Sequence, residues 1–425
     1  MIVGNSIGAG IMRTPGDVAA WLPSPGLFLA AWIAGGVYAL LGAASLAELG
    51  VMIPKSGGQY VFAHHTFGPY AGFVIGWSDW ISSCASGAAV SIVVGEYVSF
   101  LAPTTMGRAS ITAVAVMIFF TLLQWRGIRW GDRTQQFTSL LKALAFAALI
   151  IACFILPPMG PKPEATSIAR AAPSIAAVVL AMQAVIYTYD GWNGVLYFSE
   201  EVREPAHDIP RSMLGGVASV TLIYVLVNVA FLYVLGIAGM AGSNFAAGAA
   251  AQALFGPRGD TVIRVMMVVS MLSSVNAILL LSSRVPFAMS RDGLFPAAAA
   301  RVNVGGTPTV TLLASSLLTI GFIVTGTFAI AAGIAAFFFV LQYVASFAAV
   351  FVLRRREPDR PRAYRAIGYP WTTGIVFVGG VAFLIGAIVQ DRRNSMIAIA
   401  LLVGSWPLYQ VIKRFMRPRS ASGEP

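Results

Sequence analysis

About twelve apolar segments run through this chain of 425 residues, each close to the ~20 residues that an α-helix needs to cross a bilayer. They cover roughly residues 1–22, 26–52, 69–100, 108–126, 134–157, 174–200, 211–238, 260–288, 307–326, 328–353, 368–390 and 395–412. Only 11% of the residues are charged, against roughly a quarter in an ordinary soluble domain, which is too few to coat a soluble globule. The pattern predicts an all-α polytopic membrane protein in a lipid bilayer and excludes a soluble enzyme.

The connections between these segments carry their charges unevenly. If the N-terminus lies in the cytoplasm, the loops and C-terminal tail on the cytoplasmic side hold more than twice as many Lys and Arg residues as the loops on the outer side. Positive loop charge favours the cytoplasmic side, so both termini are expected there, with the protein in the plasma (inner) membrane. The same bias accounts for the net charge of +11, and no nucleic-acid partner is expected.

The two cysteines and the first residues of the chain exclude further classes. Cys84 and Cys153 both lie in apolar runs, and the three histidines show no metal-ligand spacing, so no disulfide framework, metal or cofactor is expected. Met1 opens directly on an apolar segment that lacks the basic region and cleavage site of a signal peptide. This start predicts that the first half of the first helix is missing from the sequence.

Two of the predicted helices contain residues that interrupt a helix at membrane depth. Residues 4–10 (GNSIGAG) place three glycines in the first segment, and each costs a helix about 1 kcal/mol, although the G-x-x-x-G pair among them also fits close helix packing. Residues 187–194 (YTYDGWNG) place an acid, an amide and two glycines inside the sixth segment. If residues 1–157 and 174–353 are two five-helix repeats, the interruptions occupy matching positions, which indicates a transporter binding site.

Unwound backbone at these two positions supplies both halves of a binding site. Free N–H groups at the start of a half-helix attract a carboxylate, and free C=O groups at the end of another attract an ammonium group. A site that offers both is matched to a zwitterion. The side chain of Asp190 either attracts the ammonium group or caps a half-helix, and the residues leave both interpretations open.

The motifs at and beyond these interruptions resemble the amino acid–polyamine–organocation (APC) superfamily, and within it the L-type amino acid transporter branch. The matching motifs are G-A-G-I and Pro15 in the first segment, residues 47–60 (AELGVMIPKSGGQY), 189–193 (YDGWN), 200–211 (EEVREPAHDIPR) and 282–296 (SSRVPFAMSRDGLFP). The resemblance runs from Gly4 to Pro296, and the last four helices match only in number. It implies a LeuT-type five-plus-five inverted repeat, with two additional helices at 368–412 and a cytoplasmic tail at 413–425.

The resemblance also implies binding roles for individual positions. It assigns the substrate carboxylate to the backbone N–H groups of Ala9, Gly10 and Ile11, the amino group to the carbonyls of Ser6, Tyr187 and Asp190, and the gate or pocket to Tyr187, Tyr189, Gly191 and Trp192. Relatives often have Ser where this chain has Ala9, so a hydroxyl contact is lost while the backbone donor remains.

Lys142 lies about eight residues, or ~12 Å, into the fifth segment. It either snorkels to the cytoplasmic face or corresponds to the family's helix-5 lysine, which stands where sodium-coupled relatives bind an ion. In the second case Ser273 and Ser274 of the eighth segment are its expected neighbours, and its ammonium group excludes sodium. Lys142 then either braces the helices or carries a transported proton.

The remaining acidic residues in the segments receive weaker predictions. Glu48, Glu200, Glu201 and Asp292 lie at helix ends and are expected to form ion pairs with arginines. Asp79 and Glu96 of the third segment are expected to serve packing or a gate rather than to contact the substrate.

The implied function is sodium-independent secondary transport of amino acids by alternating access, as an exchanger or proton symporter that works as a monomer. A polyamine or cationic amino acid carrier with Asp190 as counter-ion is the alternative, and a transport-inactive sensor is a remote one. An enzyme is not expected, because the second motif of an intramembrane aspartyl protease is absent.

Some eukaryotic relatives are disulfide-linked to a partner through an outer-loop cysteine. The corresponding loop, residues 101–108, has none, so no such subunit is expected.

Overall fold

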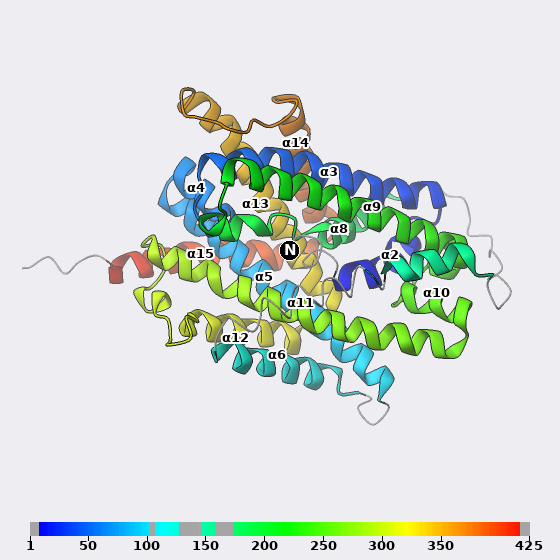
Figure 1. Ribbon diagram of the computed structural model, residues 1–425. Coiled ribbons are helices and arrows are strands. Elements are labelled where there is room, and N and C mark those ends of the chain that lie inside the picture. Colours follow the sequence, from blue (N-terminus) through cyan, green and yellow to red (C-terminus); the bar gives the residue numbers. More distant parts are fainter. Residues whose placement is uncertain (1–7, 103–106, 127–143, 145, 158–172, 417–425) are drawn as a thin grey trace, which may run out of the picture.

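The computed structural model describes residues 8–102, 107–126, 144, 146–157 and 173–416 (Figure 1). Helices dominate these residues, and eight of them are long and apolar enough to cross a membrane. The longer elements are α2 (Ala9–Trp21), α3 (Pro25–Met52), α5 (Pro69–Leu101), α6 (Ala109–Trp125), α8 (Ile175–Tyr189), α9 (Pro205–Met240), α11 (Pro257–Arg291), α12 (Thr309–Thr325), α13 (Phe328–Arg356), α14 (Trp371–Gln390) and α15 (Arg392–Met416). Every predicted segment contains a described helix, so the predicted polytopic helical fold is confirmed.

Two short helices lie where the sequence predicts only connections. They are α4 (Gln59–Phe67) and α10 (Ala246–Phe255). Both are too short to cross a bilayer, so a search for membrane-spanning runs passes over them. The Ala-rich sequence of α10 has high helix propensity, and both helices bury much of their surface against longer neighbours.

Proline and glycine set the corners between several helices. α3, α5, α9 and α11 each begin with proline, whose fixed φ suits the first helical position. Gly68, between α4 and α5, and Gly256, between α10 and α11, have φ values of +92° and +73°, which glycine adopts without steric cost. The chain therefore reverses within a single residue at both corners.

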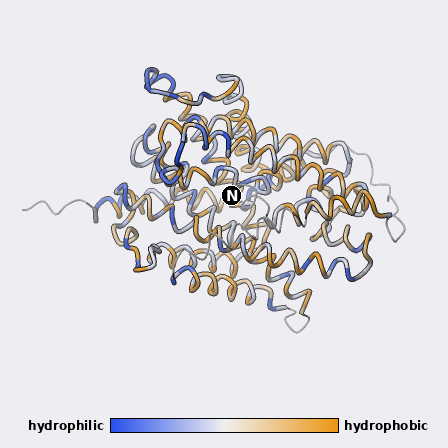
Figure 2. The backbone as a smooth tube through the Cα atoms, viewed as in Figure 1, coloured by the Kyte–Doolittle hydropathy of each residue, from blue (hydrophilic) through white to orange (hydrophobic). Residues whose placement is uncertain are grey.

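The interior of the bundle is formed by α5, which packs against α11, α13, α4, α6 and α12, while α3 lies beside α9 (Figure 1). Hydrophobic residues follow the length of the helices, and hydrophilic residues gather mainly at helix ends and in loops (Figure 2). α5 is an exception, because it buries the polar side chains of Ser78, Asp79, Ser82 and Ser91. A polar interior in a membrane helix points to a functional region.

The predicted ion pairs are present for Glu48, Glu200 and Glu201, but among the described residues the structure shows none for Asp292. Glu48, only 2% exposed, lies 2.6 Å from an Arg354 nitrogen and 3.3 Å from Arg362, and it accepts a further bond from a backbone N–H. At the end of α11, Arg284 and Arg291 pair with Glu201 and Glu200 at 3.0 and 3.7 Å. Asp292 instead accepts a hydrogen bond from the Tyr60 hydroxyl at 3.2 Å.

Candidate functional site

The sixth predicted segment is interrupted at the predicted position. α8 ends at Tyr189, and a 3₁₀ helix, η2 (Gly194–Glu201), begins after four intervening residues. Between them Gly191 has a φ of +104°, a conformation that only glycine adopts readily. The interruption leaves the last carbonyl groups of α8 without the full set of partners that a continuous helix would give them.

The first described helix begins at the predicted glycine motif. Gly8 is extended, with φ −130° and ψ −154°, and α2 starts at Ala9. The N–H groups of Ala9, Gly10 and Ile11 therefore belong to the first turn, where the helix itself supplies no acceptor. Residues 4–7, including Ser6, lie outside the described residues.

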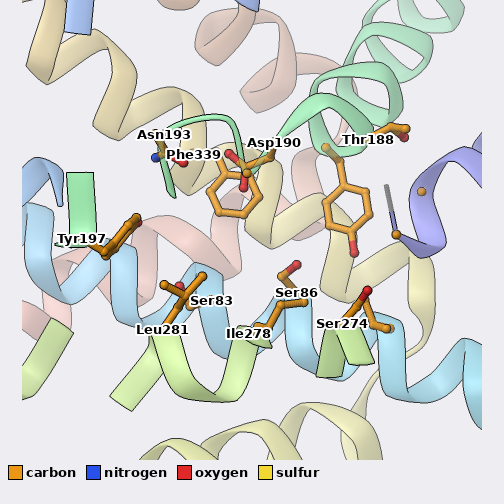
Figure 3. Close-up of a pocket in the computed structure, with 15 residues that line it drawn as sticks. Ser83, Ser86, Thr188, Asp190, Asn193, Tyr197, Ser274, Ile278, Leu281 and Phe339 are labelled. Carbon is orange, nitrogen blue, oxygen red and sulfur yellow. The ribbon is translucent and has the colours of Figure 1, made fainter. Parts of the chain in front are cut away.

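Both features border one cavity of about 70 Å³ (Figure 3). Ser83 and Ser86 of α5 and Ser274 of α11 supply hydroxyl groups to its wall, and Ile278, Leu281 and Phe339 supply apolar surface. The full lining is Gly8, Gly10, Ser83, Ser86, Val90, Tyr187, Thr188, Asp190, Gly191, Asn193, Tyr197, Ser274, Ile278, Leu281 and Phe339. Residues 274, 278 and 281 are three to four positions apart, so they lie on one face of α11.

Several predicted site residues meet at this cavity. Gly10, Tyr187, Asp190, Gly191 and Ser274 all line it. Ile11 and Ser273 are buried, with 0% and 6% of their surface exposed, but their side chains do not form part of the lining. Lys142 lies outside the described residues, so its predicted position beside the two serines stays a prediction.

Two predicted pocket residues face other parts of the molecule. The Tyr189 hydroxyl donates a hydrogen bond to the Trp32 carbonyl at 2.9 Å, and its ring packs on Tyr224 with 5.0 Å between centroids. Trp192 stacks on Tyr343, also at 5.0 Å. Tyr189 therefore anchors the end of α8 to α3 and α9, while Trp192 supports a neighbour of the cavity.

Some lining residues carry no predicted role. Ser83 and Ser86 were detectable in principle, because they belong to a run of small polar residues in an otherwise apolar helix. Phe339 lies in the run Phe337–Phe338–Phe339, where the sequence does not indicate which ring faces the cavity. Tyr343 contributes from behind the wall by donating a hydrogen bond to the carboxyl group of Asp190.

A second cavity, lined in part by Asp17 of α2 and Phe328 of α13, adjoins the first at Tyr187. Tyr187 lines both cavities, and its ring meets Phe328 edge-on at 5.9 Å. The Arg13 guanidinium lies 4.8 Å from the centre of the Phe328 ring and pairs with Glu96 of α5. Glu96 thus joins α5 to α2 and forms no part of the cavity lining, and its packing or gate role stays a prediction.

These features define the class of protein. The chain is a multi-pass helical membrane protein with a small cavity, where the start of one helix and the broken end of another meet several hydroxyl groups. Such a cavity can hold a small polar solute within the thickness of a membrane, which is the arrangement of a carrier.

The family follows from comparison with known sequences. The amino acid permease family model matches residues 1–406, and the chain belongs to this family, as the sequence motifs predict. The serine/threonine exchanger SteT of Bacillus subtilis is 28% identical over 97% of this chain and 95% of its own length. The mouse large neutral amino acids transporter small subunit 2 and the mouse Asc-type amino acid transporter 1 are 31% and 30% identical, each over 96% of this chain and 78% of its own length. These relatives are named as transporters or exchangers, which agrees with a protein that is not an enzyme.

Proposed function

We propose that this protein is a sodium-independent secondary transporter that carries amino acids across the plasma membrane by alternating access. The observation that carries the proposal is that the first turn of α2 and the broken end of α8 border the same cavity. In this assignment the N–H groups of Ala9, Gly10 and Ile11 bind the substrate carboxylate. The carbonyls of Ser6, Tyr187 and Asp190 bind its amino group.

The proposed architecture follows the predicted repeat. Residues 1–157 and 174–353 form two inverted five-helix repeats, residues 368–412 add two helices, and residues 413–425 form a cytoplasmic tail. The corresponding interruptions at α2 and α8 and the arginine-rich loop after α13 support this arrangement with both termini in the cytoplasm.

The size of the cavity favours small substrates. A water molecule needs roughly 10–15 Å³ of such volume, so the cavity holds about five to seven water-sized groups. Serine has a comparable number of heavy atoms, whereas an aromatic amino acid has about twice as many. We therefore assign small neutral amino acids as substrates, which agrees with the name of the serine/threonine exchanger among the relatives.

Coupling and assembly complete the proposal. In this proposal Lys142 has the role that the resemblance implies: its ammonium group replaces the ion of sodium-coupled relatives, so transport proceeds without sodium. The protein works as a monomer and without a disulfide-linked subunit. In support of this, residues 101–108 contain no cysteine, and Cys84 and Cys153 are both buried.

A panel of competitors tests the proposed site. Purified protein in liposomes loaded with serine is supplied with radiolabelled serine outside, and unlabelled alanine, threonine, serine methyl ester, ethanolamine or putrescine is added in excess. The proposal requires competition by the amino acids and none by the ester or the amines, because each of these lacks a free carboxylate. Competition by ethanolamine as strong as that by alanine would contradict the carboxylate site.

Asp190 favours a second candidate function, a carrier of cationic amino acids or polyamines. Its carboxyl group lines the cavity, where it can pair with a cationic substrate side chain. Strong inhibition by putrescine or lysine, together with none by alanine, would establish this alternative in place of the first.

A further inference from the structure

A second carboxyl group lies directly behind the cavity wall. Asp79 of α5 is 1% exposed, and the Tyr197 hydroxyl lies 2.8 and 2.9 Å from its two oxygens. Tyr197 itself lines the cavity, where Figure 3 shows its ring beyond Asn193 along the interrupted segment. Asp79 is therefore connected to the substrate space through one phenol hydroxyl.

Asp190 repeats this arrangement on the cavity wall. Its carboxyl group lines the cavity and accepts a hydrogen bond from the Tyr343 hydroxyl. Within the described residues, no hydrogen bond or ion pair joins either carboxyl group to a cationic side chain. Two acidic groups thus share one region of the membrane interior with phenols as partners.

Among the described residues, several cationic groups on the elements packed around α5 are engaged elsewhere. Arg284 and Arg291 of α11 pair with Glu201 and Glu200 of η2, Arg354 of α13 pairs with Glu48, and Arg13 of α2 pairs with Glu96. In the part of the chain that the structure describes, His64 and His65 of α4 and Lys413 and Arg414 of α15 make no hydrogen bond or ion pair with Asp79, and the Tyr60 hydroxyl of α4 donates to Asp292. The described helices α6 and α12 carry no titratable side chain.

The far side of Asp79 is closed by the glycine loop before α4. A Cβ atom added at Gly58 would lie 3.2 Å from an Asp79 oxygen and 2.8 Å from the Tyr197 ring, so the loop backbone covers the pair closely. Gly58 has a φ of +82°, and its N–H donates a hydrogen bond to the Leu196 carbonyl at 3.3 Å. Asp79 therefore lies between the cavity and the loop that we place on the cytoplasmic side.

Acidic side chains within a membrane are costly, and where they persist they commonly mark proton relays. A carboxyl group can accept a proton from one side and release it to the other when the adjoining helices move. Neither group is needed to bind the zwitterion, because the two helix ends already serve its carboxylate and amino groups.

We propose that Asp79, together with Tyr197 and Asp190, is the proton-binding site that couples amino acid transport to the proton gradient. The proton binds to an Asp79 carboxylate oxygen while the cavity is open to the outside. It is released to the cytoplasm when the loop at Gly58 separates from Tyr197, so substrate and proton move in the same direction. This inference rests on the proposed transport function and assigns the proton to Asp79 rather than to Lys142.

Uptake by proteoliposomes tests the assignment. Labelled serine uptake is measured with the outside more acidic than the inside, with equal pH on both sides, and with a protonophore. We expect the gradient to stimulate wild-type uptake several-fold, and the protonophore to abolish the stimulation. Asp79→Asn should lose the stimulation but retain serine exchange at equal pH. The control Asp17→Asn, which changes an acidic residue of α2 outside the lining of the substrate cavity, should keep both.

Each other outcome has a defined meaning. Wild-type uptake that ignores the gradient overturns the proton assignment while leaving amino acid exchange intact, and absence of serine uptake in every arm overturns the proposed function instead. If Asp79→Asn retains stimulation and Lys142→Gln loses it, the proton belongs to the lysine. Should Asp79→Asn fail to fold, Tyr197→Phe must change the external pH of half-maximal uptake, and an unchanged pH profile refutes the proposal.

Discussion

Substitution of Gly10 by alanine should displace the two halves of the site from each other. A Cβ atom at this position would lie 2.8 Å from the Thr188 hydroxyl oxygen and 2.9 Å from the Thr188 Cα, whereas ordinary contacts begin near 3.4 Å. The threonine cannot turn away freely, because its hydroxyl is bonded to Thr14 at 3.0 Å and to the Ala184 carbonyl at 2.8 Å. α2 and α8 must therefore separate by about 0.5 Å.

The size of the effect follows from the cost of overpacking. Extra atoms in a close-packed interior cost about 1–3 kcal/mol, and this strain falls between the helix start and the helix end that bind the substrate. If about 1–2 kcal/mol of this strain weakens substrate binding, the apparent affinity for serine falls by roughly 5- to 30-fold. Gly10→Val adds two more methyl groups at the same contact, so we expect it to lose thermal stability as well as binding.

Gly215→Ala in α9 is the matched control, because a Cβ atom there meets nothing within 4 Å. It should leave uptake unchanged and stabilise the protein slightly, since alanine favours a helix by roughly 0.5–1 kcal/mol over glycine. The measurements are the KM of labelled serine uptake and the thermal unfolding midpoint in detergent. A Gly10→Ala protein with wild-type KM would show that this contact does not set the geometry of the site.

Three further predictions concern other parts of the molecule. Glu48→Gln should lower the unfolding free energy by about 3–5 kcal/mol, because it leaves Arg354 and Arg362 without their shared carboxylate, and a melting temperature within a degree of wild type would contradict this. Phe339→Ala should enlarge the cavity and raise the ratio of phenylalanine to serine uptake at least several-fold, and an unchanged ratio would show that this ring does not limit substrate size. Lys142→Ala should severely impair transport, while wild-type uptake should be the same in sodium and in choline buffers. Stimulation by a sodium gradient would overturn the role of Lys142.

The sequence by itself determined the membrane-spanning helices and the place where one of them breaks. Long apolar runs have no stable alternative to a helix in lipid, because every backbone group must be satisfied within the segment. Asp190 and Gly191 interrupt such a run, and no continuous membrane helix accommodates them without cost. The ion pair between Glu48 and an arginine was also predictable, because a buried carboxylate at a helix end needs a cationic partner.

Only the tertiary structure decided which side chains face the cavity. α5 and α13 are packed against other helices on several sides and bury polar as well as apolar residues, so hydrophobic periodicity does not distinguish one face from another. Tyr187 and Tyr189 are two residues apart in one motif, yet one lines the cavity and the other bonds to Trp32. The pairing of Asp79 with Tyr197 joins residues 118 positions apart, and such a contact exists only because the break after α8 turns the chain back onto α5.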